Sequence, residues 1–418
     1  MDRREFLIRT VEASLAVGAS RLAAGPAPTR GADAAASPDP KREREPEAPS
    51  GLITVFLGGD VMTGRGIDQV LPHPGAPRLF ESHVRAATRY VELAEAVSGP
   101  IPKPADYSYI WGDALEVFDR AAPDARVINL ETSVTTSDEA WRGKGVHYRM
   151  HPANVPCIGA ASIDCCVLAN NHVLDWGTSG LEETLATLER AGIRTAGAGH
   201  DLGAAAAPAV LQLGAKGRVL VFGFGALSSG VPREWAATGS RPGVNLLPDL
   251  SRTTVRRIAD EVRGAKREGD LVVASIHWGA NWGYEVHRGA QEFARGLIDE
   301  AGVDVVHGHS SHHARGIEVY RDRPIVYGCG DLINDYEGIG GYETFRPDLA
   351  LTYFPTLDPS DGRLVRFEIS PFKIRRFRLN RASRADADWL RETLSREGER
   401  LGTWVEPGRE DTLTLRWR

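Results

Sequence analysis

Short apolar runs recur along the chain, and several of them end abruptly in polar residues or glycine. Short, predominantly apolar runs are typical of strands buried on both faces, as in parallel sheets. The runs that end in this way cover residues 52–57, 125–130, 163–169, 271–276 and 303–306. They predict a buried sheet whose strand ends carry polar side chains.

Segments with helical periodicity separate these runs. The clearest covers residues 179–191, with Thr178 or Ser179 as N-cap and Gly192 as its stop. Alternation of strands and helices predicts an α/β fold, and three strand pairs add antiparallel hairpins. The other predicted helices cover residues 79–97, 113–120, 152–160, 251–266, 290–301 and 384–399, and the pairs are 209–213 with 218–223, 316–320 with 325–327, and 349–354 with 364–369.

The strand ends carry the residue types of a metal site. The run at 303–306 leads into His307, His309, His312 and His313, although the whole chain has only 12 histidines. Imidazole is the commonest protein ligand for transition metals, so this cluster favours a metal site over a merely polar turn. The other strand ends supply Asp60, Asn129, Glu131, Asn170, Asn171, His172 and His277.

Several of these residues also have a structural alternative. Asp60 could cap the segment that follows it, and Asn170 and Asn171 could simply hold a turn. His172 could bond only to Asp175 in the next turn. Taken together, however, carboxylates, an amide and several imidazoles suit a pair of divalent ions such as Mn, Fe or Zn, or a single one. Two such ions can activate a water and stabilise an in-line displacement.

The N-terminal region differs in composition from the rest of the chain. Arg3 and Arg4, followed by Phe6 and Leu7, match the twin-arginine export pattern, and a mildly apolar stretch and a Pro/Ala-rich run follow. Residues 1–51 are therefore expected to be a signal peptide and disordered linker, although an uncleaved membrane tether or a charged tail with a chance Arg-Arg pair are alternatives. The expected location is the periplasm or cell surface.

Composition bears on two further questions, whether the protein binds nucleic acid and whether it contains disulfides. The 418 residues carry a net charge of −6 with both signs interspersed, which excludes the basic surplus of a nucleic-acid-binding protein. The four cysteines lie in apolar runs with no CxxC spacing, so they are expected to be small buried hydrophobes without disulfides.

Five motifs follow one another along the chain: Gly59-Asp-Val-Met62, Asn129-Leu-Glu131, Ala169-Asn-Asn-His172, Ile276-His-Trp-Gly279 and Gly308-His-Ser-Ser-His312. This set resembles the CapA family, capsule-synthesis proteins associated with poly-γ-glutamate that are similar to calcineurin-like metallophosphoesterases. The resemblance runs from Thr54 to Tyr336. The chain departs from the phosphoesterase pattern at Met62, where a histidine would stand, and at Asn129-Leu-Glu131, in place of Gly-Asp-x-x-Asp.

The resemblance implies a four-layer α-β-β-α sandwich with two mixed sheets, formed by residues 52–355, on which strands and a helix from residues 356–418 pack. It also implies the site. Asp60 and His312 would hold one metal, Asn171, His277 and His309 the other, Glu131 would bridge them, and His172 would donate a proton or stabilise an anion. Arg65 and Asn170 are expected to contact the substrate.

Two functions follow from this resemblance. One is an exported metal-dependent hydrolase or transferase acting on a phosphoester or an acyl or amide bond of an anionic surface polymer. The other is a non-catalytic, polymer-binding component of a membrane-bound capsule synthesis complex. The near-complete ligand set favours the first, and the missing histidine at Met62 favours the second.

Overall fold

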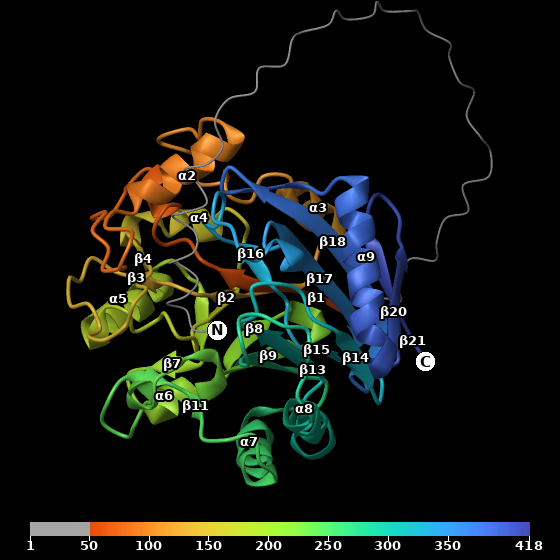
Figure 1. Ribbon diagram of the computed structural model, residues 1–418. Helices are drawn as coiled ribbons and strands as arrows, with labels where there is room; N and C mark the ends of the chain where they lie inside the picture. Colours follow the sequence, from red (N-terminus) through yellow and green to blue (C-terminus); the bar gives the residue numbers. More distant parts are fainter. Residues whose placement is uncertain (1–50) are drawn as a thin grey trace, which may run out of the picture.

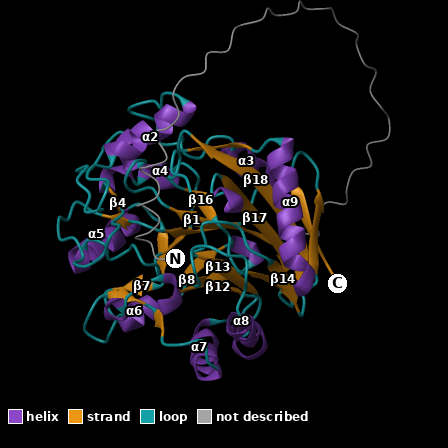
Figure 2. Cartoon of the chain, in the orientation of Figure 1, coloured by secondary structure: helices purple, strands orange, loops and turns teal. Residues whose placement is uncertain are grey.

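The computed structural model describes residues 51–418, so the predictions for residues 1–50 lie outside the described part of the chain. The fold is mixed α/β, with two large mixed sheets and helices around them (Figures 1 and 2). From residue 51 onward, no helix is long and apolar enough to cross a membrane.

The first sheet has β1 near its centre. β1 lies between β2, which runs parallel to it, and the antiparallel β17, while β16 pairs with the end of β1. In order, the sheet contains β20 (Thr403–Pro407), β21 (Leu413–Trp417), β18 (Arg363–Arg375), β17 (Leu349–Asp358), β1 (Ile53–Val61), β2 (Ala125–Leu130), β5 (Cys165–Val167) and β6 (Arg194–Ala196), with β16 (Asp331–Ile333) beside β1 and β19 (Arg378–Arg381) beside β18.

The second sheet is built around the parallel strands β9, β12 and β13. In order, it contains β11 (Leu246–Leu247), β9 (Arg218–Ala226), β12 (Leu271–His277), β13 (Val305–His309), β15 (Arg323–Val326) and β14 (Ile317–Tyr320), with β8 (Ala209–Gln212) antiparallel to β9. Two short pairs are separate: β3 (Ser133–Val134) with β4 (Arg149–Met150), and β7 (Ala198–Gly199) with β10 (Gly243–Val244).

Three large apolar clusters hold these elements together. One takes side chains from both sheets, such as Val55 on β1 and Val273 on β12. A second lies on the outer face of the first sheet, and a third lies between the second sheet and its helices. The helices are α2 (Thr88–Ser98), α3 (Ala114–Ala121), α4 (Pro156–Gly159), α5 (Gly177–Arg190), α6 (Leu202–Ala206), α7 (Arg252–Ala265), α8 (Arg288–Ala301) and α9 (Arg384–Gly398).

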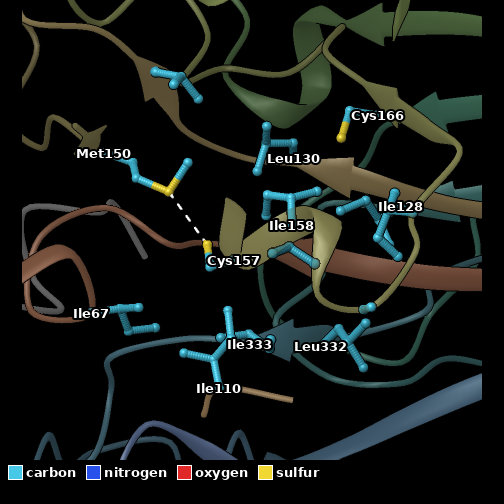
Figure 3. Close-up of a cluster of buried hydrophobic side chains, with 14 of the residues drawn as sticks. Ile67, Ile110, Ile128, Leu130, Met150, Cys157, Ile158, Cys166, Leu332 and Ile333 are labelled. Carbon is cyan, nitrogen blue, oxygen red and sulfur yellow. Dashed lines mark hydrogen bonds between the residues drawn. The ribbon is translucent and has the colours of Figure 1, made fainter. Parts of the chain in front are cut away.

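The cysteines belong to these clusters. Figure 3 shows Cys157 and Cys166 among isoleucine and leucine side chains, with the Cys157 sulfur 3.9 Å from that of Met150. All four cysteines of the chain are buried and free, which confirms that they behave as small hydrophobes.

The C-terminal residues belong to the first sheet and to the helix that flanks it. Strands β18 to β21 extend the sheet beyond β17, and Leu390 and Leu394 of α9 join the cluster between the sheets. Helix α9 begins where Ser383 accepts a hydrogen bond from the Asp386 backbone, the usual N-cap arrangement. This region therefore completes the core beside β17.

Two predicted helices begin elsewhere than expected. Helix α5 begins at Gly177, with Trp176 as its N-cap and no side-chain cap bond, so neither Thr178 nor Ser179 caps it. Residues 79–97 have helical periodicity, but the helix begins only at Thr88, and Arg78 instead forms a β-bridge with Ala86. Tertiary contacts explain why residues 79–87 do not join this helix. Glu81 is fully buried and bonds to Arg65 and Tyr90, and Leu79 and Val84 pack against Tyr90. These contacts outweigh local helix propensity.

Candidate metal centre

The polar strand ends of both sheets meet at one place. In the first sheet, Asp60 on β1 lies in register with Asn129 on β2, and β5 follows in parallel beside β2. In the second, His277 on β12 lies in register with His309 on β13. Ligands of α/β proteins bind at the carboxyl ends of parallel strands, and here two such edges face each other.

Asp60 is the residue that joins the two edges. Its carboxylate forms one potential metal-ligand group with His277 and His309, and a second with His312 and Asp331. Within each group the ligand atoms all lie within 4.8 Å of one another, and every member is buried. Asp60 therefore lies where a shared ligand of two ions would be needed.

The environment of Asp60 favours a bound cation. Its Oδ1 accepts a hydrogen bond of 2.7 Å from the Asn129 amide, its Oδ2 accepts one of 3.1 Å from the Ser310 backbone, and its carboxyl also bonds to Glu131. Burial, together with the charge of Asp331, raises the pKa of Asp60 to about 8. Several acids buried together are costly unless positive charge compensates them, and a divalent ion would do so.

His277 and His309 supply neutral nitrogen ligands. Their Nδ1 atoms lie 2.8 Å apart, and His309 Nδ1 is 3.7 Å from Asp60 Oδ1. Burial and the two neighbouring histidines hold the pKa of His309 well below its usual value, so its imidazole is neutral at neutral pH. Two neutral nitrogens this close need a proton or a metal between them, which matches the chemistry of a metal site.

Asn171 and Glu131 complete the side of the centre formed by the first sheet. Asn171 Oδ1 lies 2.9 Å from His277 Nε2, and Glu131 Oε1 lies 3.9 Å from the same nitrogen. All the predicted ligands are thus in one cluster. The carboxylate common to both ligand groups is Asp60, and the bridging role that the resemblance implies for Glu131 stays a prediction.

Asp331 is a candidate ligand that the sequence analysis missed. It begins β16, which pairs in parallel with the end of β1 and places Asp331 beside Asp60. Its Oδ1 lies 2.9 Å from His312 Nδ1, and its Oδ2 accepts a hydrogen bond from Asn334. The only sequence signal was an acidic residue directly after Cys329-Gly330.

His172 lies next to the ligand groups. Its Nε2 is 3.6 Å from Glu131 Oε1, and its Nδ1 is 2.6 Å from Asp175 Oδ2. The predicted alternative bond to Asp175 therefore exists, but it leaves Nε2 directed at the centre. An Asp that holds one imidazole nitrogen orients the other, as in catalytic His–Asp pairs.

Lys144 was also missed, because it comes from a loop far from the strand ends in sequence. Its ammonium bonds to Asp175 and to the Asn171 carbonyl and lies 3.0 Å from His172 Nδ1. Burial raises the pKa of Asp175, and the Lys144 charge opposes that rise. The lysine thus favours the ionised form of the carboxylate that orients His172.

Arg65 and Asn170, predicted to contact substrate, both have partners within the protein. Arg65 is buried, forms a two-bond pair with Asp335 at 3.1 and 2.5 Å, and also bonds to Glu81 at 3.0 Å. Asn170 donates to Asn129 and to the Leu130 carbonyl and accepts from the His172 backbone. In these positions they brace the loops beside the centre, and substrate contact by either stays a prediction.

Comparison with known proteins places the chain in a family. Residues 54–336 match the family model of the bacterial capsule synthesis protein PGA_cap. The chain is 51% identical over 355 residues to a probable polyglutamine synthesis accessory protein of Mycobacterium tuberculosis, and the aligned region covers 85% of this chain and 93% of that protein. It is 27% identical over 324 residues to the PGA biosynthesis protein CapA of Bacillus subtilis, covering 77% and 72%.

Among solved structures, a novel phosphatase of Mycoplasma pneumoniae aligns with a TM-score of 0.42 and 10% identity, covering 77% of this chain and 94% of that one, a likeness too weak to bear on function. The family model, in contrast, spans well over half of the chain. The protein therefore belongs to the bacterial capsule synthesis protein family, PGA_cap.

Proposed function

We propose that this protein is an exported component of capsule or poly-γ-glutamate synthesis that binds divalent metal ions and acts on a phosphoester, or on an acyl or amide bond, of an anionic surface polymer. The observation that carries the proposal is the pair of buried ligand groups sharing Asp60. A protein that only bridges other proteins has no physical need to bury so many polar strand ends. The names of the relatives supply the polymer class.

The donor set fits Mn, Fe or Zn, because it combines carboxylate and amide oxygens with neutral imidazoles. Asp60, His277, His309, Asn171 and Glu131 would hold one ion, and Asp60, His312 and Asp331 the other. When bound, such ions lower the pKa of a coordinated water and stabilise negative charge on the reacting group.

The other residues of the centre have roles that follow from their contacts. Asp175 and Lys144 hold His172 so that its Nε2 faces Glu131 and the centre. From there His172 donates a proton to the leaving group or stabilises its charge. Arg65 and Tyr148 line the same side, where the guanidinium carbon lies 4.5 Å from the centre of the tyrosine ring.

The three apolar clusters also support the four-layer α-β-β-α arrangement of metallophosphoesterases, because one cluster draws on both sheets and the other two lie on outer faces. Export is proposed from the twin-arginine pattern at Arg3 and Arg4. Cell fractionation tests it, and a cytoplasmic protein that retains residues 1–50 would contradict it.

The alternative is a non-catalytic, polymer-binding subunit of a membrane-bound synthesis complex, favoured by Met62 in place of a ligand histidine. Metal analysis of protein purified without chelators, followed by Mn or Zn titration, tests the metal site. We expect at least one bound ion per chain, and no binding under either condition would overturn the proposal. If metal binds, hydrolysis of p-nitrophenyl phosphate diesters and of poly-γ-glutamate decides between enzyme and binding subunit.

A further inference from the structure

A hydrogen-bond relay runs from His309 through Ser275 and His307 to the Gly58 carbonyl, away from the candidate metal centre. His307 and His309 are two residues apart on β13, so their side chains lie on the same face of the strand. Ser275 lies opposite His307 on the neighbouring strand β12. The Ser275 hydroxyl is 2.9 Å from His307 Nδ1 and 2.9 Å from His309 Nε2. All three residues are fully buried.

The Gly58 carbonyl at the end of this relay determines which atom donates and which accepts in each of its hydrogen bonds. His307 Nε2 lies 3.0 Å from the backbone carbonyl of Gly58, which can only accept, so Nε2 carries the hydrogen. The bonding partners of His307 are a carbonyl and a hydroxyl, neither of them charged, and the imidazole is neutral. A neutral imidazole has one N–H, and His307 Nδ1 is therefore an acceptor.

The positions of the hydrogens on Ser275 and His309 follow from that of His307, one after the other. The single hydroxyl hydrogen of Ser275 goes to His307 Nδ1, which leaves the Ser275 oxygen as the acceptor for His309. His309 then carries its hydrogen on Nε2. Its Nδ1 is left without a hydrogen, so it is an acceptor, and this atom lies 3.7 Å from Asp60 Oδ1 and 2.8 Å from His277 Nδ1.

We propose that Ser275 and His307 are positioning residues that fix the tautomer and orientation of His309, so that it presents Nδ1 to a divalent metal ion. This inference rests on the proposed metal site. The relay begins at the Gly58 backbone of β1, in the first sheet, and ends at a ligand of the second. It thereby couples the metal-binding form of His309 to the packing of the two sheets. Partners of this kind, which hold the second nitrogen of a ligating histidine, typically contribute 10- to 100-fold to metal affinity.

The test combines metal titration with nitrogen NMR of the histidine side chains. In Ser275→Ala we expect Mn and Zn affinity to fall by about 10- to 100-fold, because His309 is no longer held in one tautomer. Ser370→Ala is the matched control, since Ser370 is a buried strand serine of the first sheet, on β18. Its affinity should equal that of the unmodified protein.

In the metal-free protein, NMR should show His309 with a hydrogen on Nε2 and none on Nδ1. The His309 signal is assigned by its loss in His309→Gln. Protonation on Nδ1 would overturn the relay, and so would unchanged metal affinity in a folded Ser275→Ala. The NMR measurement needs neither a metal nor the Ser275 variant. It therefore decides the relay even if Ser275→Ala fails to fold, or if the protein binds no metal and the proposed function fails.

Discussion

Asp60 should make the metal-free protein less stable as the pH rises. Its pKa is raised from 3.8 to about 8 by burial and by the charge of Asp331. Above the ordinary pKa the unfolded chain has released this proton, whereas the folded protein still binds it until about pH 8. Because the folded state binds more protons, the free energy of unfolding falls with rising pH over this window.

The magnitude follows from the shift. Each pH unit within the window costs about 1.4 kcal/mol, so the rise from pH 5.5 to 7.5 should lower the free energy of unfolding by about 3 kcal/mol. Urea unfolding in EDTA across this range measures the slope. Other groups also titrate, and Asp60→Asn removes this group alone. The difference between the two slopes therefore isolates Asp60, whatever the absolute stability of the variant.

A divalent metal should reverse the effect. The ion binds the ionised carboxylate, so its apparent affinity should rise about tenfold per pH unit up to about pH 8 and then level off. Equal slopes for the metal-free protein and Asp60→Asn would refute the reasoning, because they would mean that Asp60 carries no extra proton in the folded state. A metal affinity that is flat between pH 6 and 8 would refute it independently.

Three substitutions test other parts of the centre. His172→Ala should lower turnover of a hydrolysed substrate by roughly 10²- to 10⁴-fold while metal content stays near wild type, whereas equal loss of metal would make His172 a ligand. Asp331→Asn should remove the ion held with His312 and leave the one held by His277 and His309, so metal analysis should find one ion fewer per chain; an unchanged count would exclude Asp331 as a ligand. Lys144→Met should lower the free energy of unfolding by roughly 3 kcal/mol in urea titrations, because fully buried Asp175 loses its cation, and no loss would show that the pair contributes nothing.

Much of the candidate centre could be predicted because its signals are local. An apolar run that ends in Asp60, in Asn171-His172 or in His309 is visible within a few residues, and strand alternation indicates which side chains share a face. The same holds for Gly192, which stops α5, and for the buried cysteines. These features depend on residues that are neighbours along the chain, so a short stretch of sequence is enough to predict them.

Contacts between distant segments could not be read in this way. Asp331 becomes a candidate ligand only because β16 pairs with β1, and Lys144 reaches His172 from a loop on another part of the chain. Glu81 leaves the expected helix because Arg65 needs a buried counter-charge. His307 looked like one more histidine of a metal cluster, yet the Gly58 carbonyl of the opposite sheet makes it a support for His309. The residue types at the strand ends follow from the sequence, but which of them become neighbours depends on how the two sheets pack, because burial and charge pairing act across space rather than along the chain.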